Sequence, residues 1–324
     1  MKYAQAIGKA LRVILDQDPD AVLIGTDIGR SGGVFGVTRG LWEDFGDDRI
    51  IDMPIAEMGT IGLAVGAAMT GLRPIVELMY LDFIGVCLDQ LMNQAAKVHQ
   101  MSGGRIEVPL VIRSQFGAGG RAGPQHSQSL EGILAAIPGL TVICPSTARD
   151  AYGLLLSAAQ ASSPVIFLEN RRLYGYEESI GDEDLSPIPI GSARVCRAGS
   201  DATCVTYSRM THLCRQAADH LYAEYGLSIE IIDLRTLYPI DLDTVFASVR
   251  RTGKLLVAHE AVKQFGPGAE IAAKVAEKCF DQLDGPISRI GAPRSAVPFS
   301  PPLEDAYLPS LEQIQKAMLD LARW

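Results

Sequence analysis

The chain has 324 residues, of which 48% are hydrophobic and 21% charged, and its formal net charge is −9. This length is typical of roughly two domains, each with a sizeable core. The negative balance argues against a polyanion-binding surface, so no nucleic-acid partner is expected. No apolar run reaches the roughly 20 residues that span a membrane, so no membrane partner is expected either.

Cysteine usage and the first residues of the sequence indicate a compartment. The six cysteines are scattered, without the C-x-x-C pairs of zinc or iron–sulfur sites. Several lie in apolar runs, which predicts buried free thiols in a reducing environment. The first residues lack the pattern of a signal peptide and instead begin an amphipathic helix. Together these features predict a cytoplasmic protein.

Strand-like and helix-like runs alternate through the first half of the sequence. A first helix ends before Pro19, because proline cannot continue it, and a buried strand follows over 21–25. A polar, glycine-rich loop follows over Asp27 to Gly40, and a helix of small residues is expected after Glu57. Later elements are a strand at 73–78, an amphipathic helix from Ile84 to Val98, strands at 108–113, 141–144 and 164–169, and a capping box at Thr147–Asp150.

The second half repeats this alternation after an irregular stretch. Residues 176–199 are acidic and proline-bearing without clear periodicity, which predicts an interdomain connection. Continuous apolar strands spaced by helices are typical of parallel sheets covered on both faces. We therefore predict two doubly wound α/β domains, 1–185 and 200–324, joined by a linker over 186–199. The expected strands are 202–207, 228–234, 254–259 and 286–290, and the expected helices are 209–225, 241–251, 268–283 and 309–322.

Glu57 is the most informative residue, because it is one carboxylate in the apolar and small run Pro54–Gly66. Desolvation by such neighbours would raise its pKa, and a buried acid held near neutrality is a proton donor. The alternative is an ordinary surface or capping acid. Gly62 and Gly66 share one helix face, which favours close helix packing or a subunit interface.

Other candidates are weaker when judged from residue type alone. A lone histidine is usually structural, and a lone phenylalanine usually belongs to a core. His126, however, follows a glycine-rich loop and is expected near a helix N-terminus, which would keep the imidazole neutral. The loop Phe116–Gly123 lacks a phosphate-binding pattern, so we expect a mobile active-site loop. The other histidines are interpreted as structural, with His259–Glu260 a weak candidate for an interface or access-channel role.

The sequence resembles a known family over essentially its whole length. Glu57, Gly62 and Gly66 fit the pattern E-x4-G-φ-x-x-G, which resembles the signature of thiamin diphosphate enzymes. More widely, the chain resembles the β subunit of 2-oxo acid dehydrogenases of the pyruvate and branched-chain types. That resemblance implies a thiamin pyrimidine-binding domain followed by a transketolase C-terminal-like domain. The segments that carry it are IAEMGTIGLAVGAAMTGLRPIVELMYLDF, LDQLMNQAAK, MSGG, QHSQSLE, IPGLTVICPST, PVIFLENRRLYG, IDLRTLYPID and GPGAEIAAKV.

The resemblance implies roles for individual residues. Glu57 matches the acid that bonds the aminopyrimidine N1′ and stabilises the imino tautomer, which removes the thiazolium C2 proton. Phe83 matches the aromatic residue that packs against the same ring, and Met79 is a neighbour that would line the pocket. His126 matches an active-site histidine and is assigned to substrate or lipoyl handling.

The resemblance also implies metal ions and partners. The Mg²⁺-binding G-D-G motif of thiamin enzymes is absent from this sequence, so Mg²⁺ ligands are expected on a separate α subunit in an α2β2 heterotetramer. Relatives also hold K⁺ through main-chain carbonyls, and this chain has Ala161 and Ser163 where relatives often have acidic or amide side chains. The matching positions are Leu110, Ala158, Ala159, Ala161 and Ser163.

The activity implied is oxidative decarboxylation of a 2-oxo acid, with acyl transfer to the disulfide of a lipoyl group on an acyltransferase core. The sequence does not name the 2-oxo acid. Three alternatives stay open: the β subunit of an acetoin dehydrogenase, the C-terminal subunit of a split transketolase, and a non-catalytic assembly subunit. The presence of Glu57, Phe83 and His126 together argues against a decayed site.

Overall fold

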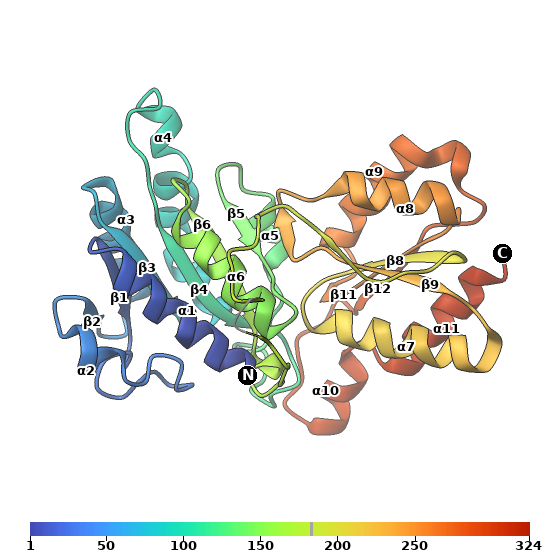
Figure 1. Cartoon of the computed structure of the whole chain (residues 1–324), viewed down its shortest axis with the longest axis horizontal. Helices are drawn as coiled ribbons and strands as arrows, with labels where there is room; N and C mark the ends of the chain where they lie inside the picture. The colour runs from blue at the N-terminus through green and yellow to red at the C-terminus, as the bar shows by residue number, and fades with distance from the viewer. Residues whose placement is uncertain (182–183) are drawn as a thin grey trace. The chain divides into compact units, whose positions relative to one another are not determined.

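The computed structural model describes residues 1–181 and 184–324, which form two compact units (Figure 1). Unit 1 comprises Met1–Phe116 and Ile133–Ile190, and unit 2 comprises Gly117–Gly132 and Gly191–Trp324. Each unit is an α/β layer structure with a mainly parallel sheet, as the sequence predicts. The predicted bounds differ in two respects. Gly117–Gly132 groups with unit 2 rather than with the domain predicted over 1–185, and the predicted linker over 186–199 is divided between the units after Ile190.

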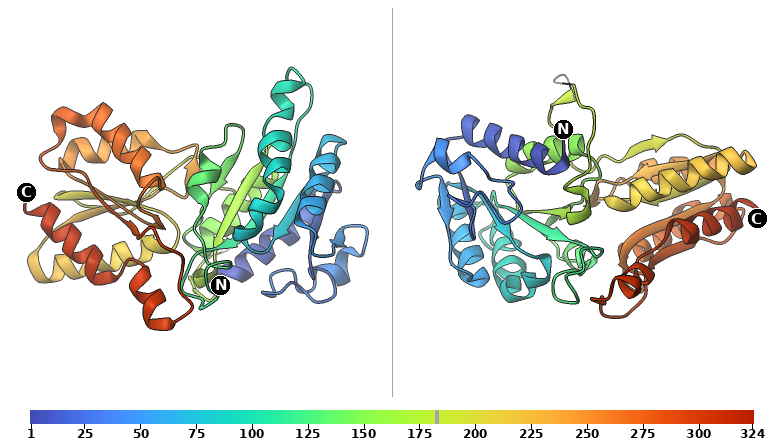
Figure 2. Two further views of the ribbon diagram at one scale, coloured as in Figure 1. Left: turned by 180° about the vertical axis from the view of Figure 1, so that it is seen from behind. Right: turned by 90° about the horizontal axis from the view of Figure 1, so that it is seen from below.

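The sheet of unit 1 has the strand order β5-β6-β4-β3-β1-β2, and every neighbouring pair is parallel. α1 and α6 cover one face, where their apolar residues form one core with alternate strand residues such as Leu23 and Phe167. α3 and the short helical segments η1 (3₁₀) and η2 (π) lie on the other face (Figure 2). The strands are β1 (Ala21–Gly25), β2 (Ile50–Asp52), β3 (Arg73–Leu78), β4 (Val111–Phe116), β5 (Thr141–Ile143) and β6 (Val165–Asn170).

The helices of unit 1 follow the sequence signals with one exception. Thr147 caps α6 by accepting a hydrogen bond from the backbone N–H of Asp150 (3.1 Å), whereas the Asp150 carboxylate accepts from the Thr147 hydroxyl (2.8 Å). The helix predicted from Ile84 to Val98 is instead divided into short segments, although Leu91 and Ala95 are buried as predicted. The elements are α1 (Tyr3–Gln17), α2 (Leu41–Phe45), α3 (Glu57–Met69), η1 (Leu81–Cys87), η2 (Gln90–Ala95), α4 (Val98–Met101), α6 (Ala148–Ala159) and η3 (Arg171–Leu173), with α5 (Glu131–Ala135) crossing the unit boundary.

The sheet of unit 2 has the order β12-β11-β8-β9-β7. α7 and α11 cover one face, and α8 and α9 cover the other (Figures 1 and 2). β7 (Arg194–Arg197) lies at the edge and is antiparallel to β9. The other elements are β8 (Ala202–Thr206), α7 (Arg209–Tyr225), β9 (Ile229–Asp233), β10 (Thr236–Tyr238), α8 (Leu242–Thr252), β11 (Leu255–Val262), α9 (Pro267–Cys279), η5 (Phe280–Gln282), β12 (Ser288–Ala292), α10 (Pro301–Tyr307) and α11 (Leu311–Ala322).

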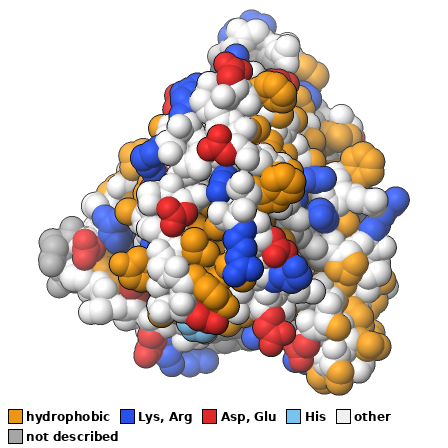
Figure 3. Space-filling model, turned by 90° about the vertical axis from the view of Figure 1, so that its right-hand side faces the viewer, with side chains coloured by type: hydrophobic (Ala, Val, Ile, Leu, Met, Phe, Trp, Pro, Cys, Tyr) orange, Lys and Arg blue, Asp and Glu red, His pale blue; other side chains and the backbone are white. Residues whose placement is uncertain are grey.

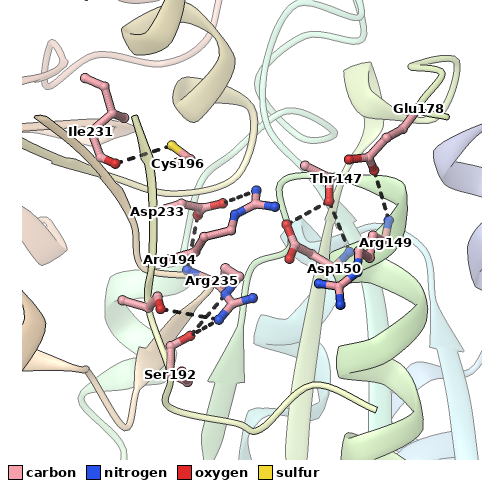
Figure 4. A network of polar contacts seen from close by, with 11 residues as sticks. Thr147, Arg149, Asp150, Glu178, Ser192, Arg194, Cys196, Ile231, Asp233 and Arg235 are labelled. Atoms are coloured by element: carbon pink, nitrogen blue, oxygen red, sulfur yellow. Dashed lines mark hydrogen bonds and ion pairs between the residues drawn. The ribbon is translucent and has the colours of Figure 1, made fainter. Parts of the chain in front are cut away.

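The predicted linker over 186–199 is wrong where β7 forms, because side chains tie this segment to β9. Arg194 forms an ion pair with the buried Asp233 (3.3 Å), and the guanidinium of Arg235 donates to the Ser192 carbonyl (3.0 and 2.6 Å) (Figure 4). The Cys196 thiol donates to the Ile231 carbonyl at 3.4 Å. These partners are distant in sequence, so the local composition gave no sign of a strand.

The surface and the thiols agree with the bulk composition. On the face shown in Figure 3, acidic and basic side chains alternate, and hydrophobic ones lie singly or in small groups. Within residues 1–181 and 184–324, no helix has the length and apolar character to cross a membrane. The six cysteines are free thiols, and all but Cys196 are buried, as predicted.

Candidate functional site

Glu57 is the first residue of α3, in unit 1, and its side chain is half-buried. Its carboxylate accepts no hydrogen bond from any residue that the structure describes. The thiol of Cys87, on η1, lies close enough to the Glu57 carboxylate for its negative charge to raise the pKa of the thiol. Burial first, and the Glu57 charge second, raise the pKa of Cys87 to about 12. Glu57 is therefore an acid without a partner of its own, placed beside a thiol that stays protonated.

The expected dry surroundings of Glu57 are not supplied by its own flanking residues. Ile61 is fully buried, but Ile55 is 82% exposed and Met58 56% exposed. A Cβ atom at Gly66 would meet no atom within 4 Å, and one at Gly62 would make an ordinary contact of 3.7 Å with Gln90. The prediction that the chain itself buries Glu57 is thus wrong. An apolar, open surface surrounds the acid instead, and only another molecule could remove it from water.

Met79 directly follows β3, and Phe83 belongs to η1. Both are half-buried, and the N–H of Phe83 donates to the Tyr80 carbonyl (2.9 Å). The Tyr80 ring meets Phe35 edge-on (5.8 Å between centroids) and lies under the Arg171 guanidinium (5.5 Å). Because α3 packs against η1, Glu57, Met79 and Phe83 belong to one side of unit 1.

A buried charge network, not foreseen from the sequence, lies beneath these residues. Arg113 is fully buried on β4 and bonds Glu77 on β3 (2.9 Å) and Glu169 on β6 (2.7 and 3.1 Å). Tyr174 donates to Glu169 and accepts from the Gln115 amide (3.0 Å). Burial raises the pKa of Glu77, which Arg113 partly opposes.

The network explains why β4 continues beyond its predicted end. The predicted strand ended at residue 113, yet the polar side chains of Ser114 and Gln115 continue β4 because they find partners within unit 1. Glu77 pairs in register with Arg113, and Gln115 pairs with Glu169. The Ser114 hydroxyl donates to the Leu78 carbonyl (2.7 Å). These bonds hold the end of β3, from which Met79 and Phe83 follow.

His126 belongs to unit 2, in the segment Gly117–Gly132. It is half-buried in a turn in which its N–H donates to the Gly123 carbonyl (3.4 Å). Since α5 begins only at Glu131, the expectation of a helix N-terminus at His126 is wrong. The loop before His126 was expected to be mobile, but it is held by hydrogen bonds. The buried carboxylate of Glu304 accepts from the backbone N–H groups of Gly119 (2.7 Å) and Arg121 (3.1 Å).

Glu131 closes the same segment, and sequence reasoning missed it. It is fully buried, and the Tyr207 hydroxyl donates to one of its oxygens (2.8 Å). Burial, the largest cause, raises the pKa of Glu131 to about 7, and the nearby charge of Glu260 adds to the rise. Glu260 itself is paired with Arg209. A carboxyl group with this pKa carries a proton at mildly acid pH.

His259 has a structural role, as the sequence suggested. It is fully buried, and its Nδ1 bonds the Ala261 carbonyl (3.0 Å) while Nε2 accepts from the Gly268 N–H in the first turn of α9 (3.2 Å). Burial lowers the pKa of His259 to about 4. Cβ atoms at Gly266, Gly268 or Gly291 would lie within 2.9 Å of its ring, which accounts for glycine at these positions. Nothing here supports an access channel.

The five carbonyl groups proposed for K⁺ lie in unit 1, and those of Leu110, Ala158, Ala159 and Ala161 already accept hydrogen bonds. The Leu110 carbonyl accepts from Val165 N–H (2.8 Å), and the Ala158 carbonyl from Ala161 N–H (3.2 Å). The carbonyls of Ala159 and Ala161 both accept from Nη1 of Arg73 (3.2 and 3.5 Å). Arg73 therefore brings positive charge to two of the five groups. A carbonyl has a second lone pair, so a monovalent cation fits here only as an addition.

The sequence-predicted residues thus divide between the two units. Glu57, Met79, Phe83 and the K⁺ carbonyls lie in unit 1, and His126 lies in unit 2. Arg113, Glu131 and Glu304 were missed because each is defined by partners far away in sequence. Among them, only Arg113 gave a signal: a charged residue between a run of apolar strand residues and a polar stretch.

Comparison with known proteins first defines the class. A family model for the pyrimidine-binding domain of transketolase matches residues 1–177, and a model for the transketolase C-terminal domain matches 191–314. Among solved structures, a chain described as a split-gene transketolase in an inactive β4 tetramer shares the fold, with a TM-score of 0.79 at 22% identity over 100% of this chain and 98% of that one. The molecule is a transketolase-like α/β protein.

The relatives by sequence narrow this class to a family. This chain is 46% identical to the β subunit of acetoin:2,6-dichlorophenolindophenol oxidoreductase from Cupriavidus necator, over 96% of this chain and 94% of that one. It is 43% identical to the subunit of the same name from Bacillus subtilis, over 99% and 97%. It is 42% identical to the β subunit of the pyruvate dehydrogenase E1 component from Staphylococcus epidermidis, over 97% and 96%. The chain belongs to the family of transketolase-like β subunits that includes these proteins.

Proposed function

We propose that this chain is the β subunit of a thiamin diphosphate-dependent dehydrogenase component, and that Glu57 activates the cofactor. The observation that carries the proposal is the full-length identity of 41–46% to named β subunits, with Glu57 left unpartnered at the start of α3. When bound, thiamin diphosphate supplies a carbon nucleophile that attacks a substrate carbonyl. Glu57 holds a proton at the aminopyrimidine N1′, and Phe83 and Met79 hold the ring.

The residues of unit 1 fit an aminopyrimidine ring. A carboxyl group that no described residue bonds is available to the ring nitrogen, and the half-buried Met79 and Phe83 offer apolar contact. Glu57 needs to be dry to retain its proton near neutral pH, and Ile55 and Met58 are exposed. We therefore propose that the cofactor and a partner subunit together cover this surface.

We propose an α subunit as that partner, in an α2β2 assembly. The sequence lacks the G-D-G motif, so we assign Mg²⁺ and the diphosphate to the α subunit. The relatives' names include the word subunit, which supports a second chain. The exposed apolar side chains of the α3 region, including Leu63 and Val86, are the kind of surface that an obligate partner covers.

The proposed reaction is oxidative decarboxylation of a 2-oxo acid, pyruvate or a branched-chain acid, with transfer of the acyl group to a lipoyl disulfide on an acyltransferase core. His126 is assigned to binding the substrate or the lipoyl group. Acetoin cleavage is a second candidate, favoured by the 46% and 43% identities to acetoin oxidoreductase subunits. We further propose a cytoplasmic location and, at the carbonyls described above, K⁺.

The test is co-expression with a candidate α subunit that carries the G-D-G motif missing from this chain. Dye-coupled oxidation of pyruvate, branched 2-oxo acids and acetoin is measured with and without thiamin diphosphate and Mg²⁺. We expect turnover only when both subunits and both cofactors are present. Preference for acetoin over pyruvate would select the second candidate. Full activity of this chain alone would refute the proposal of a shared site.

A further inference from the structure

The loop that carries His126 has an unusual backbone. Gly117, Gly119, Arg121 and Gly123 all have positive φ angles, of +93°, +96°, +57° and +74°. Such alternation turns successive N–H groups toward one point and forms a concave anion-binding arrangement. Arg121 is the non-glycine member, so its left-handed conformation requires local compensation.

The anion held by this loop is the carboxylate of Glu304, on α10 of the same unit. Glu304 is fully buried, and one oxygen accepts from the Gly119 N–H (2.7 Å). The other accepts from both the N–H (3.1 Å) and the guanidinium (2.8 Å) of Arg121. The glycine-rich loop therefore binds an anion, but the anion belongs to the protein itself. This arrangement leaves these N–H groups occupied and explains why no phosphate-binding pattern is present.

Further contacts fix the loop on both sides of this anchor. The Ala118 methyl group is buried with Val297, Tyr307 and Leu308. A Cβ atom at Gly123 would lie 2.2 Å from the Phe299 ring, so the ring lies directly against this glycine. All of these partners come from the segment 297–308, which follows β12.

The anchor is connected to His126 through short backbone bonds. The Gly117 N–H donates to the Gln128 carbonyl (3.3 Å), which closes the loop, and the His126 N–H donates to the Gly123 carbonyl (3.4 Å). A loop with four glycines loses much conformational entropy when it is ordered, so its geometry depends on such an anchor. Without Glu304, the N–H groups of Gly119 and Arg121 would lose their acceptor. The loop that precedes the turn at His126 would then no longer be held in one conformation.

We propose that Glu304 is a positioning residue for the reaction, which acts by holding the His126 loop in one conformation. The inference rests on the proposed function, because it requires that His126 handles substrate. Glu304 lies in unit 2 and touches none of the residues assigned to the aminopyrimidine ring. Its loss should therefore affect substrate turnover and leave cofactor affinity unchanged.

Limited proteolysis of the full chain tests the anchor without any assay of activity. In Glu304→Gln one carboxylate oxygen is replaced by an NH₂ group, which cannot accept a hydrogen bond from the donors of Gly119 or Arg121. Only one acceptor oxygen remains, so the loop is released. We expect trypsin to cleave after Arg121 at least about tenfold faster in this variant, because local opening becomes easier. The matched control is Asp305→Asn, since Asp305 binds the same guanidinium (2.8 and 3.0 Å) but is 58% exposed. An exposed pair of this kind contributes little, so cleavage in the control should stay within about twofold.

A double-mutant cycle with the α subunit present tests the connection to His126. We expect Glu304→Gln to lower kcat/KM by about 10- to 100-fold, because small displacements of a catalytic group have costs of this size. In a His126→Gln background the same change should have an effect below about twofold, since the residue that Glu304 positions is already gone. Arg121→Gly is the second variant. It keeps a left-handed backbone and the buried carboxylate, and the same non-additivity is expected.

Each outcome decides something different. Unchanged cleavage after Arg121 in Glu304→Gln, or losses that add in the double mutant, would overturn the positioning role. Weakened binding of thiamin diphosphate, measured by titration calorimetry, would also overturn it, because the effect would then not be confined to the loop. If His126→Gln kept full turnover, the assignment of His126 would fail and the inference with it. Faster proteolysis would then show that Glu304 orders a loop without a catalytic role.

Discussion

Glu57 in unit 1 and Glu304 in unit 2 are acids that differ in burial and in hydrogen bonding. Glu304 is fully buried and binds two backbone N–H groups and a guanidinium of its own chain. Glu57 is half-buried, accepts no hydrogen bond from the described residues and has exposed apolar neighbours. A carboxylate with internal partners stabilises structure, whereas one without them is available to a ligand. Among the described residues, Glu57 is thus an acid that a ligand could reach, whereas Glu304 is an acid that orders a loop of its own unit.

Removing the acid without partners should affect activity far more than stability. We expect Glu57→Gln to lower turnover of the assembled enzyme by about 10²- to 10⁴-fold, the range of a lost acid–base group. Its free energy of unfolding should change by less than about 0.5 kcal/mol, because no internal hydrogen bond is lost. Dye-coupled assays and urea denaturation measure the two effects.

The control for this variant is Glu43→Gln, which neutralises an exposed acid in the first turn of α2. It should leave both turnover and stability near their original values. If Glu57→Gln retained most of its turnover, Glu57 would not be the activator. If Glu57→Gln lost much of its unfolding free energy, Glu57 would contribute to stability as the internally bonded acids do, and the proposed difference between them would be wrong.

Breaking the Arg113 network should produce the reverse result. Arg113→Met leaves Glu77 and Glu169 buried without their cation, and removing one partner of a buried ion pair costs about 3–5 kcal/mol. We expect this loss of unfolding free energy in guanidinium titrations at pH 8. At pH 5 the loss should be smaller, because burial raises the pKa of Glu77 and this carboxyl group protonates more readily there.

Arg105→Met is the control for this experiment, because Arg105 is an exposed arginine that donates a hydrogen bond to the Ser102 carbonyl (2.9 Å). It should change stability by less than about 0.5 kcal/mol. Equal losses in the two variants would show that the buried network contributes no more than a surface arginine.

These two regions also show how far the sequence can lead. The apolar patterns of the sequence placed β1, β3 and α7 at the residues where they are found, because such patterns arise from the element itself. The edge strand β7 and the extension of β4 were missed, since both depend on polar partners from distant strands. Local composition carries no record of such partners.

The candidate site divides in the same way. Glu57 could be proposed from its spacing to Gly62 and Gly66, because that pattern is local. The surroundings of Glu57 could not be predicted, because the apolar residues on either side of it form an exposed surface and not a dry pocket. Glu304 lies in the ordinary-looking segment PPLEDAY, and only the fold shows that it meets the loop of His126.

Glu131 allows the contrast between the acids to be measured as a function of pH. Its pKa is raised to about 7 in the folded chain, mainly by burial, whereas in the unfolded chain it is near 4.5. Between these values the folded state keeps a proton that the unfolded state has released. Stability from this group is therefore fully present below pH 4.5 and is lost as pH rises toward 7. The loss is about 3 kcal/mol at its upper limit.

The variant Glu131→Gln cannot release a proton, so this part of the pH dependence should disappear. Urea denaturation at each pH gives the unfolding free energy of the variant minus that of the parent chain. This difference should be more favourable to the variant at pH 8 than at pH 5. His259 has the opposite sign, because its lowered pKa removes stability as pH falls from about 6.5 toward 4, and it is unchanged in both chains. Parallel pH profiles for the two chains would show that Glu131 does not bury a proton.

The smallest effect is expected at the carbonyl groups assigned to K⁺. Arg73 already donates to the carbonyls of Ala159 and Ala161, so an added cation would gain little further attraction. Binding at tenfold above its dissociation constant stabilises a folded chain by about 1.4 kcal/mol, which corresponds to a rise in Tm of roughly 2–5 °C in a unit of this size. We expect a rise of this size or less in KCl compared with LiCl at equal ionic strength. Because the ligands are main-chain groups, Ser163→Ala should leave the difference unchanged, whereas no difference between the salts would exclude the ion and leave Arg73 as the cation of this turn.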